Sequence, residues 1–126
     1  MSRISKTTVG TISVTALRDG ERTLPFEALK NLSDEDSDNI KSDDNQSFTF
    51  TNFNACLIQN GKQNLLVDTG CGTLFGPTCG FIIEALDELG LAPDDITDIF
   101  ITHLHPDHIG GCIDEDGSAV FRNANF

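Results

Sequence analysis

The stretch "DIFITHLHPDHIGG", residues 98–111, decides the fold, because it joins an apolar run to a loop crowded with titratable side chains. Its first five residues have the β-branched and aromatic composition of a buried strand. The loop that follows holds all three histidines of the chain. Three histidines scattered at random over 126 positions fall within six consecutive residues only about once in two hundred cases. The cluster therefore indicates a site.

The spacing within this loop suits metal binding. In an extended segment His103 and His105 point to the same side, and Pro106 restricts His105 to an extended backbone. Two imidazoles can then face one ion. Because the chain turns after Pro106, Asp107 and His108 leave in another direction and can serve a neighbouring ion. Imidazole and carboxylate ligands suit Zn²⁺, Fe or Mn²⁺, with a slight preference for zinc.

A simpler explanation exists for any one of these histidines, namely a partly buried, hydrogen-bonded residue of the core. Four titratable groups within six residues, at the end of an apolar strand, would however crowd polar atoms without compensating partners, which is costly. A metal removes that conflict. Gly110 and Gly111 fit the same interpretation, because they leave room where the backbone passes close to the metals or starts a short helix.

Strand patterns dominate the first half of the chain. From Thr7 to Leu17, apolar residues alternate with Thr and Ser, which is typical of a half-buried strand. Two apolar runs follow at residues 48–58 and 63–70. The Asn60-Gly61 dipeptide between them suits the tight turn of an antiparallel hairpin.

Residues 27–47, between these strands, are too polar to form core, so we predict an acidic surface excursion with a helical turn near residues 26–32. The aspartates of Asp34–Asp38 have the one-three-five spacing of a calcium-binding loop. The turn glycine and the bidentate glutamate of such a loop are replaced by Asn39 and Asn45. The pattern therefore favours a solvated acidic loop over a calcium site.

A helix is predicted over residues 79–90, where three apolar residues fall at helical spacing. Pro77 fits its first turn and Gly90 fits its end. Residues 93–95 can form a short helical turn before the strand at 98–102. This order of hairpin strands, helix, buried strand and ligand-rich loop indicates an α/β domain with its site at the C-terminal edge of a strand.

Composition places the chain among single-domain cytoplasmic proteins. Its 126 residues include no apolar stretch long enough to span a bilayer and no export signal. A net charge of −12 without a basic patch disfavours nucleic acid and anionic membranes as partners. Cys56 sits in an apolar run and is predicted to be buried and free. Cys71 and Cys79 could form a disulfide, but a cytoplasmic chain keeps both reduced.

Two motifs together resemble the metallo-β-lactamase fold superfamily. "THLHPDHIGG" looks like its H-x-H-x-D-H signature, and "NLLVDTG" resembles the strand ending in aspartate that precedes this signature. The similarity runs in register over roughly residues 48–112. The stretches "FGPTCGFIIEALDELGLAPDDIT" and "GSAVFRNANF" look most similar to the branch of lactonases and methyl parathion hydrolase-like enzymes.

The resemblance implies a set of roles for matching residues. His103 and His105 would bind one metal, and Asp107 and His108 a second, with Asp107 also steering protons as the catalytic residue. Asp68 would orient the ligands from behind, since metal ligands need such outer partners; its alternative role is to cap the turn at the strand's end. The implied fold is the first half of an αββα sandwich, with a mixed, mainly antiparallel sheet and flanking helices.

The implied activity is hydrolysis, in which a metal-bound hydroxide held by two divalent metals attacks a small lactone, ester or phosphotriester. The sequence agrees in having no G-x-S-x-G elbow for a serine nucleophile. Two alternatives stay open. One is a non-catalytic metal-binding or assembly module, and the other is a mono-iron sulfur dioxygenase of the same fold.

The family takes further ligands from downstream, and this chain has no fourth histidine. Residues 1–126 are therefore expected to be the N-terminal part of one such domain, with incomplete metal sites. Alone, the sheet would expose an apolar face. The expected partner for that face is a missing C-terminal half or a second copy of the chain.

Overall fold

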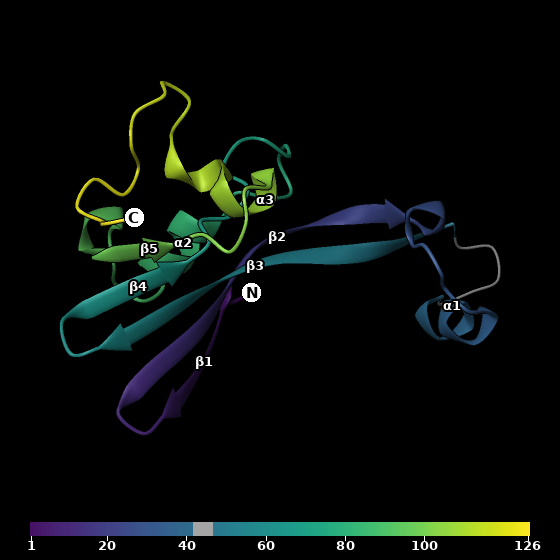
Figure 1. The fold of residues 1–126 in the computed structure, drawn as a ribbon, viewed down its shortest axis with the longest axis horizontal. Helices are drawn as coiled ribbons and strands as arrows, with labels where there is room; N and C mark the ends of the chain where they lie inside the picture. The colour runs from purple at the N-terminus through teal and green to yellow at the C-terminus, as the bar shows by residue number, and fades with distance from the viewer. Residues whose placement is uncertain (42–46) are drawn as a thin grey trace.

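The computed structural model describes residues 1–41 and 47–126, and it shows a twisted sheet in which two strands extend into a long arm (Figure 1). The strand order is β1-β2-β3-β4-β5. Pairing is antiparallel from β1 to β4, and β5 lies parallel to β4. The strands are β1 (Ile4–Val9), β2 (Ile12–Pro25), β3 (Phe48–Asn60), β4 (Gln63–Val67) and β5 (Asp98–Phe100). The predicted α/β fold with a mixed, mainly antiparallel sheet is confirmed.

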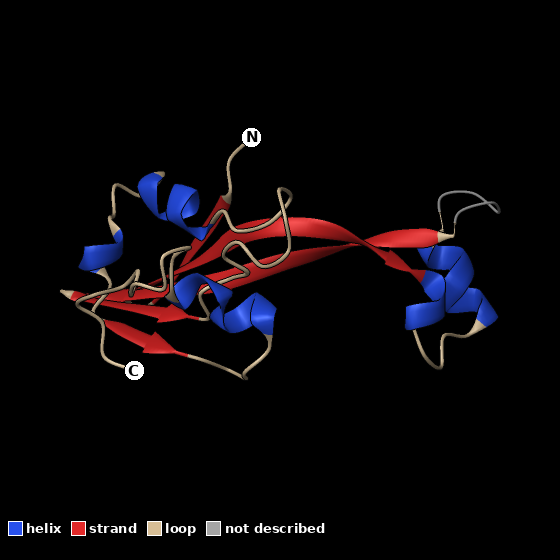
Figure 2. Cartoon of the chain, turned by 90° about the horizontal axis from the view of Figure 1, so that it is seen from above, coloured by secondary structure: helices blue, strands red, loops and turns tan. Residues whose placement is uncertain are grey.

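The helices are all short; η1 and α1 lie at the far end of the arm, and the others lie beside the rest of the sheet (Figure 2). The α-helices are α1 (Asp34–Ile40), α2 (Ile82–Asp87) and α3 (Pro106–Ile109). The 3-10 helices are η1 (Phe26–Ala28), η2 (Pro93–Asp95) and η3 (Gly110–Cys112). η2 is the helical turn that we predicted before the last strand.

The single strand predicted from Thr7 to Leu17 is wrong, because a hairpin turn divides it. Val9 pairs with Ile12 across that turn, and Gly10 has a φ of 61°. Glycine takes this left-handed conformation without steric cost, whereas a continuous strand has no place for it. The hairpin predicted at Asn60-Gly61 is confirmed, and there Gly61 has a φ of 59°.

Helix α2 is shorter than the predicted helix over residues 79–90, and Pro77 lies outside it. The cause is Asp19 of β2, because it accepts hydrogen bonds from the backbone N–H groups that precede the helix. The Gly80 N–H donates to Asp19 Oδ2 (3.2 Å), and the Phe81 N–H donates to the Asp19 carbonyl (3.0 Å). The helix also ends earlier than predicted, at Asp87, and Gly90, with a φ of 72°, lies in the turn that follows it.

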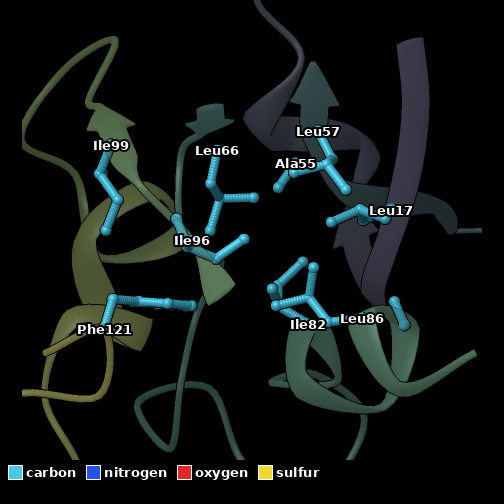
Figure 3. Packing of buried hydrophobic residues seen from close by; sticks show 10 residues of the cluster. Leu17, Ala55, Leu57, Leu66, Ile82, Leu86, Ile96, Ile99 and Phe121 are labelled. Atoms are coloured by element: carbon cyan, nitrogen blue, oxygen red, sulfur yellow. The ribbon is translucent and has the colours of Figure 1, made fainter. Parts of the chain in front are cut away.

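The core fills the space between one face of the sheet and α2 with the C-terminal segment (Figure 3). Leu17, Leu57 and Leu66 project from three neighbouring strands and have no exposed surface. Strand β5 was predicted to be buried, but this holds for one face only. Ile99 is 5% exposed and packs in the core, whereas Phe100 is 59% exposed.

The opposite face of the sheet is also apolar and is covered much less. Its residues alternate with the core residues along β2, β3, β4 and β5, and they pair with one another across these strands. None of them is fully buried, and they comprise Val14, Ala16, Cys56, Ile58, Leu65, Val67 and Phe100. We refer to these seven residues as the outer apolar face.

The arm consists of the distal parts of β2 and β3, and it carries η1 and α1 at its tip (Figures 1 and 2). The described part of the predicted excursion, residues 27–41, lies there, and η1 confirms its helical turn. Asp34–Asp38 fall in helix α1, whose first turn is capped by the Ser33 hydroxyl (Asp36 N, 3.1 Å). A capped helix replaces the loop that calcium binding requires, and Asn45 lies outside the described residues.

All four cysteines are free. Cys71 and Cys79 are buried, whereas Cys56 is only partly buried, so its predicted burial is wrong. Among the described residues, no helix combines the length and apolarity that crossing a membrane requires.

The core makes a first prediction. Replacing Leu57 by Ala deletes a fully buried side chain and should lower the free energy of unfolding by about 2–5 kcal/mol. The matched control, Leu74→Ala, truncates a side chain that is 60% exposed and should change it by less than about 0.5 kcal/mol. Urea unfolding followed by circular dichroism measures both. Equal effects of the two substitutions would contradict this core.

The buried thiols make a second prediction. Burial raises the pKa of the Cys71 thiol, and the neighbouring Asp19 carboxylate raises it further. Cys71 should therefore stay unmodified by iodoacetamide in the native protein even at pH 9 and react after unfolding in urea. Peptide mass spectrometry reads the result, with all four cysteines in urea as the control. Rapid native alkylation of Cys71 would show that the segment around it is open.

Candidate metal centre

The candidate site lies where two parallel strands end side by side. Asp68 follows β4, and Thr102 and His103 follow β5 after a short extension. The Asp68 N–H donates to the Phe100 carbonyl (2.9 Å), which prolongs the pairing of these strands by one step. The carboxyl ends of parallel strands meet at one edge of a sheet, so β4 and β5 deliver these residues to the same place.

Asp68 is the centre of the hydrogen-bond network at this edge. The residue is 6% exposed, and its backbone φ is 62°, which is uncommon outside glycine. The Thr102 backbone N–H donates to Oδ1 (2.8 Å), and the Thr102 hydroxyl donates to Oδ2 (2.9 Å). His108 Nδ1 also lies 2.8 Å from Oδ2. One side chain thus joins the end of β4, the end of β5 and helix α3.

These contacts fix the protonation of Asp68 and His108. Burial on its own raises the pKa of Asp68, but the hydrogen bonds from Thr102 and His108 outweigh it, and the pKa lies below its ordinary value. The carboxylate is therefore ionised at neutral pH and can only accept hydrogen bonds. His108 Nδ1 then donates its proton to Asp68 Oδ2, and Nε2 is the ring nitrogen that faces Asp107.

Thr102 extends the same logic to His103. The Thr102 hydroxyl donates its single proton to Asp68. Its oxygen lies 3.1 Å from His103 Nδ1. The hydroxyl oxygen accepts from this nitrogen, so His103 also carries its proton on Nδ1 and directs Nε2 away from Thr102. Asp68 thereby orients one histidine directly and a second one through Thr102.

The remaining nitrogen and oxygen atoms fall into two close pairs. His103 Nε2 lies 3.1 Å from His105 Nδ1, and His108 Nε2 lies 3.0 Å from Asp107 Oδ2. Two ligands of one tetrahedral zinc ion, each about 2.0–2.1 Å from it, are about 3.3 Å apart. Each pair is therefore close to the separation of two zinc ligands. The rings of His103 and His108 have centroids 3.9 Å apart, so the two pairs are neighbours.

Each pair supplies only two ligands. Within residues 1–41 and 47–126, no group of three or more His, Cys, Asp or Glu side chains is arranged to hold a metal ion. Tetrahedral zinc takes four ligands, so further donors must come from solvent, substrate or other protein groups. The assignment of His103, His105, Asp107 and His108 as metal ligands stays a prediction, as do the roles of Asp68 and of Asp107 as catalytic residue.

The loop after β4 holds helix α3 in place. The backbone N–H and the hydroxyl of Thr69 both donate to the His108 carbonyl, at 2.8 and 2.9 Å. A Cβ on Gly110 would collide with the Cys71 carbonyl, and a Cβ on Gly111 would collide with the Thr69 carbonyl. These glycines are therefore needed where two backbone segments touch. Of the two reasons that we predicted for these glycines, the start of a short helix is confirmed, because η3 begins at Gly110, whereas the close approach is to this loop.

A cavity of about 300 Å³ opens beside the second ligand pair. Its wall combines Asp107 and His108 with four consecutive residues of β3, Thr51, Asn52, Phe53 and Asn54. The sequence patterns did not indicate these β3 residues or Thr102 as part of the site. Two asparagines in a strand pattern were the available signal for β3, and Thr102 had none beyond its place next to His103.

Comparisons with known proteins identify the family. The family model described as "Metallo-beta-lactamase superfamily" matches residues 49–113, or 65 of the 126 residues. The chain belongs to this superfamily, as its two motifs predicted.

Among curated relatives, N-acyl homoserine lactonase AiiB of Agrobacterium fabrum is 37% identical over 83 residues, covering 52% of this chain and 30% of the lactonase. The atrochrysone carboxyl ACP thioesterase of Passalora fulva is 36% identical over 67 residues, covering 53% of this chain and 19% of the thioesterase. The chain thus spans less than a third of either relative.

Two solved structures match almost the whole chain. The hydrolase AbOPH of the β-lactamase superfamily superposes with a TM-score of 0.87 at 30% identity, covering 99% of this chain and 44% of that one. AidC, a dizinc quorum-quenching lactonase in complex with a product, gives a TM-score of 0.85 at 30% identity, covering 98% and 43%.

A third prediction concerns Asp68. Replacing Asp68 by Asn removes the charge that holds His108 and Thr102, and it should weaken zinc binding about 10- to 100-fold. Isothermal titration calorimetry with Zn²⁺ measures this change. The matched control is Asp87→Asn on the exposed side of α2, which should leave zinc affinity unchanged. If both variants bind zinc like the unmodified chain, Asp68 does not orient the ligands.

Proposed function

We propose that this chain supplies half of a two-metal hydrolytic centre, in which His103 and His105 hold one divalent ion and Asp107 and His108 hold the other. The observation that carries this proposal is the pair of short contacts, 3.1 Å and 3.0 Å, between the nitrogen and oxygen atoms assigned to each ion. Zinc is the favoured metal, because imidazole and carboxylate ligands suit it. The similarity to AidC, which is a dizinc lactonase, supports the same choice.

When bound, two such ions supply a nucleophile at neutral pH and polarise the bond to be cleaved. The chain's own residues keep the ligands ready for this chemistry. Asp68 and Thr102 hold the protons of His108 and His103 on Nδ1, so that Nε2 of each ring is free to bind. Asp107 can also receive a proton at the carboxylate oxygen that does not face His108.

The substrate class we propose is a small lactone or ester. The cavity beside Asp107 and His108 offers space of about 300 Å³ with both asparagine and phenylalanine in its wall, which suits a polar ester group joined to an apolar tail. The lactonase names of AiiB and AidC and the thioesterase from Passalora fulva support carbonyl-ester chemistry. The same nucleophile would also attack a phosphotriester.

A non-catalytic metal-binding or assembly module is the second candidate. The observation that favours it is that no described group of three or more ligating side chains is arranged around a metal. With two protein ligands per ion the metal would bind weakly and could serve mainly to order the loop. Loss of the histidines should abolish hydrolysis if the centre is catalytic, and it should impair folding if the metal has a structural role.

A fourth prediction separates them. In a longer form of the protein that supplies the remaining ligands, the double variant His103→Ala, His108→Ala should lose zinc-dependent ring opening of N-hexanoyl homoserine lactone, while its circular dichroism stays unchanged. The acid that ring opening releases measures the reaction. His103 and His108 are partly exposed, so their loss leaves the core intact. Loss of folding in the double variant, together with no turnover in the unmodified longer form, would support the structural module. Turnover that persists in the variant would contradict the ligand assignment.

We further propose that the outer apolar face packs against the rest of a longer fold. Phe100 on this face is 59% exposed, and AbOPH has more than half of its chain beyond the matched part. A continuous apolar face that is not fully covered is typical of an interface.

A fifth prediction tests this face. The 126-residue chain should self-associate at micromolar concentration in size-exclusion chromatography and should hold less than two zinc ions per chain. Phe100→Lys should reduce the association. Leu74→Lys adds the same charge at an equally exposed apolar residue that is not part of the outer apolar face, and it should not reduce the association. A stable monomer that holds two zinc ions per chain would overturn the proposal.

A further inference from the structure

Two arginines stand directly opposite each other where β1 begins beside β2. Ile4 pairs with Leu17, and at the next step of the ladder the Arg18 N–H donates to the Arg3 carbonyl (2.8 Å). Residues that face each other in an antiparallel pair project from the same side of the sheet. Like charges in this arrangement destabilise a sheet, unless a negative charge compensates them.

Neighbouring carboxylates compensate this pair only in part. Arg18 forms an ion pair with Glu21 through one nitrogen, Nη2. The Glu88 carboxylate accepts a hydrogen bond from the Arg3 backbone N–H (2.9 Å), not from the Arg3 guanidinium. That guanidinium lies over the Phe81 ring, 3.8 Å from its centroid, and donates to no acceptor among the described residues. Its N–H groups are therefore available to an anion.

Both arginines line two cavities, one of about 280 Å³ and one of about 230 Å³. Glu21 is part of the wall of the larger cavity. No carboxylate is among the described residues that line the smaller one, and its other polar side chains can all donate hydrogen bonds: Ser2, Ser5 and Asn54. The smaller cavity therefore combines two positive charges with neutral donors, which favours a negatively charged ligand.

Asn54 places this cavity next to the candidate metal centre. It pairs with Arg18 across β2 and β3, so the two side chains project from the same side of the sheet. Asn54 also lines the cavity of about 300 Å³ that contains Asp107 and His108. A group held by the two arginines would thus lie next to the space in which we place the ester.

We propose that Arg3, Arg18 and Asn54 bind the phosphate group of a phosphate monoester. Such a group carries close to two negative charges near pH 7 and has three free oxygens. It can therefore accept hydrogen bonds from both guanidinium groups at once and remove the repulsion between them. A carboxylate has one charge and two oxygens, which match a single guanidinium. The apolar part of the wall, Ile4 and Ala16, leaves space for a short alkyl group of the ester.

The binding of phosphate goes beyond the proposed hydrolysis and does not depend on it. None of its three residues is an assigned metal ligand, and the metal-free chain already presents them together. Binding can therefore be measured on the 126-residue chain without turnover.

The test is a titration of the ¹⁵N-labelled, metal-free chain with sodium phosphate at pH 8 and constant ionic strength, followed by NMR. The expected result is saturable binding, with shift changes at the Nε–H signals of Arg3 and Arg18 and at the side-chain amide of Asn54. Sodium acetate should bind at least about tenfold more weakly, because it engages one guanidinium. The absence of saturable shifts, or equal affinities for phosphate and acetate, would overturn the proposal.

Three variants locate the anion. Arg3→Gln and Arg18→Gln should each weaken phosphate binding about tenfold, because each removes a charged donor. Arg22→Gln is the matched control, since Arg22 is also on β2 but lies over Phe75 and lines neither cavity. It should change the affinity by less than about twofold, because solvent and salt screen its charge. An equal loss in all three variants would show attraction by net charge alone and would overturn the proposal.

Arg18→Lys provides a second measurement if Arg18→Gln does not fold. It keeps the positive charge beside Glu21 but loses the planar fork that engages two oxygens, and it should weaken phosphate binding about threefold or more. Undiminished binding in Arg18→Lys, or in a folded Arg3→Gln variant, would contradict the proposal.

Discussion

The contact between the Asp68 carboxylate and its donors is the constraint on which the candidate site depends. Asp68 stands at the end of β4 in a left-handed backbone conformation, and it is held there by the Thr102 backbone and hydroxyl. Its charge keeps the proton of His108 on Nδ1 and, through Thr102, the proton of His103 on Nδ1. The same carboxylate therefore determines which nitrogen each ring offers, and it does so before any metal binds. The parallel pairing of β4 with β5 is what brings these residues together.

Much of the fold could be predicted from the sequence, because local patterns determine it. Asn60-Gly61 marked the hairpin between β3 and β4, and the apolar run before His103 marked β5. The errors came from contacts between distant segments. Alternating residues on either side of Gly10 look like one strand, although a turn divides them. Helix α2 starts late because Asp19, far away in the sequence, takes the N–H groups of Gly80 and Phe81.

The site was predictable to the extent that its residues lie in one loop. The four assigned ligands are close in sequence, and the structure brings them together in two pairs. Asp68 was found through a resemblance between motifs, and the structure shows that it contacts His108. Thr102 and the β3 residues at the cavity could not be found, because their importance comes from neighbours that the fold supplies. The burial of Asp19 could not be predicted from the sequence for the same reason.

The tautomeric state of the histidine rings tests the central claim most directly. Long-range ¹H–¹⁵N correlation spectra of the metal-free chain, recorded at pH 8, distinguish a proton on Nδ1 from a proton on Nε2. We predict that His108 and His103 carry the proton on Nδ1, and that His108 loses this preference when Asp68 is replaced by Asn. A proton on Nε2 of His108 in the unmodified chain would contradict the account, because Asp68 would then have no hydrogen bond from that ring.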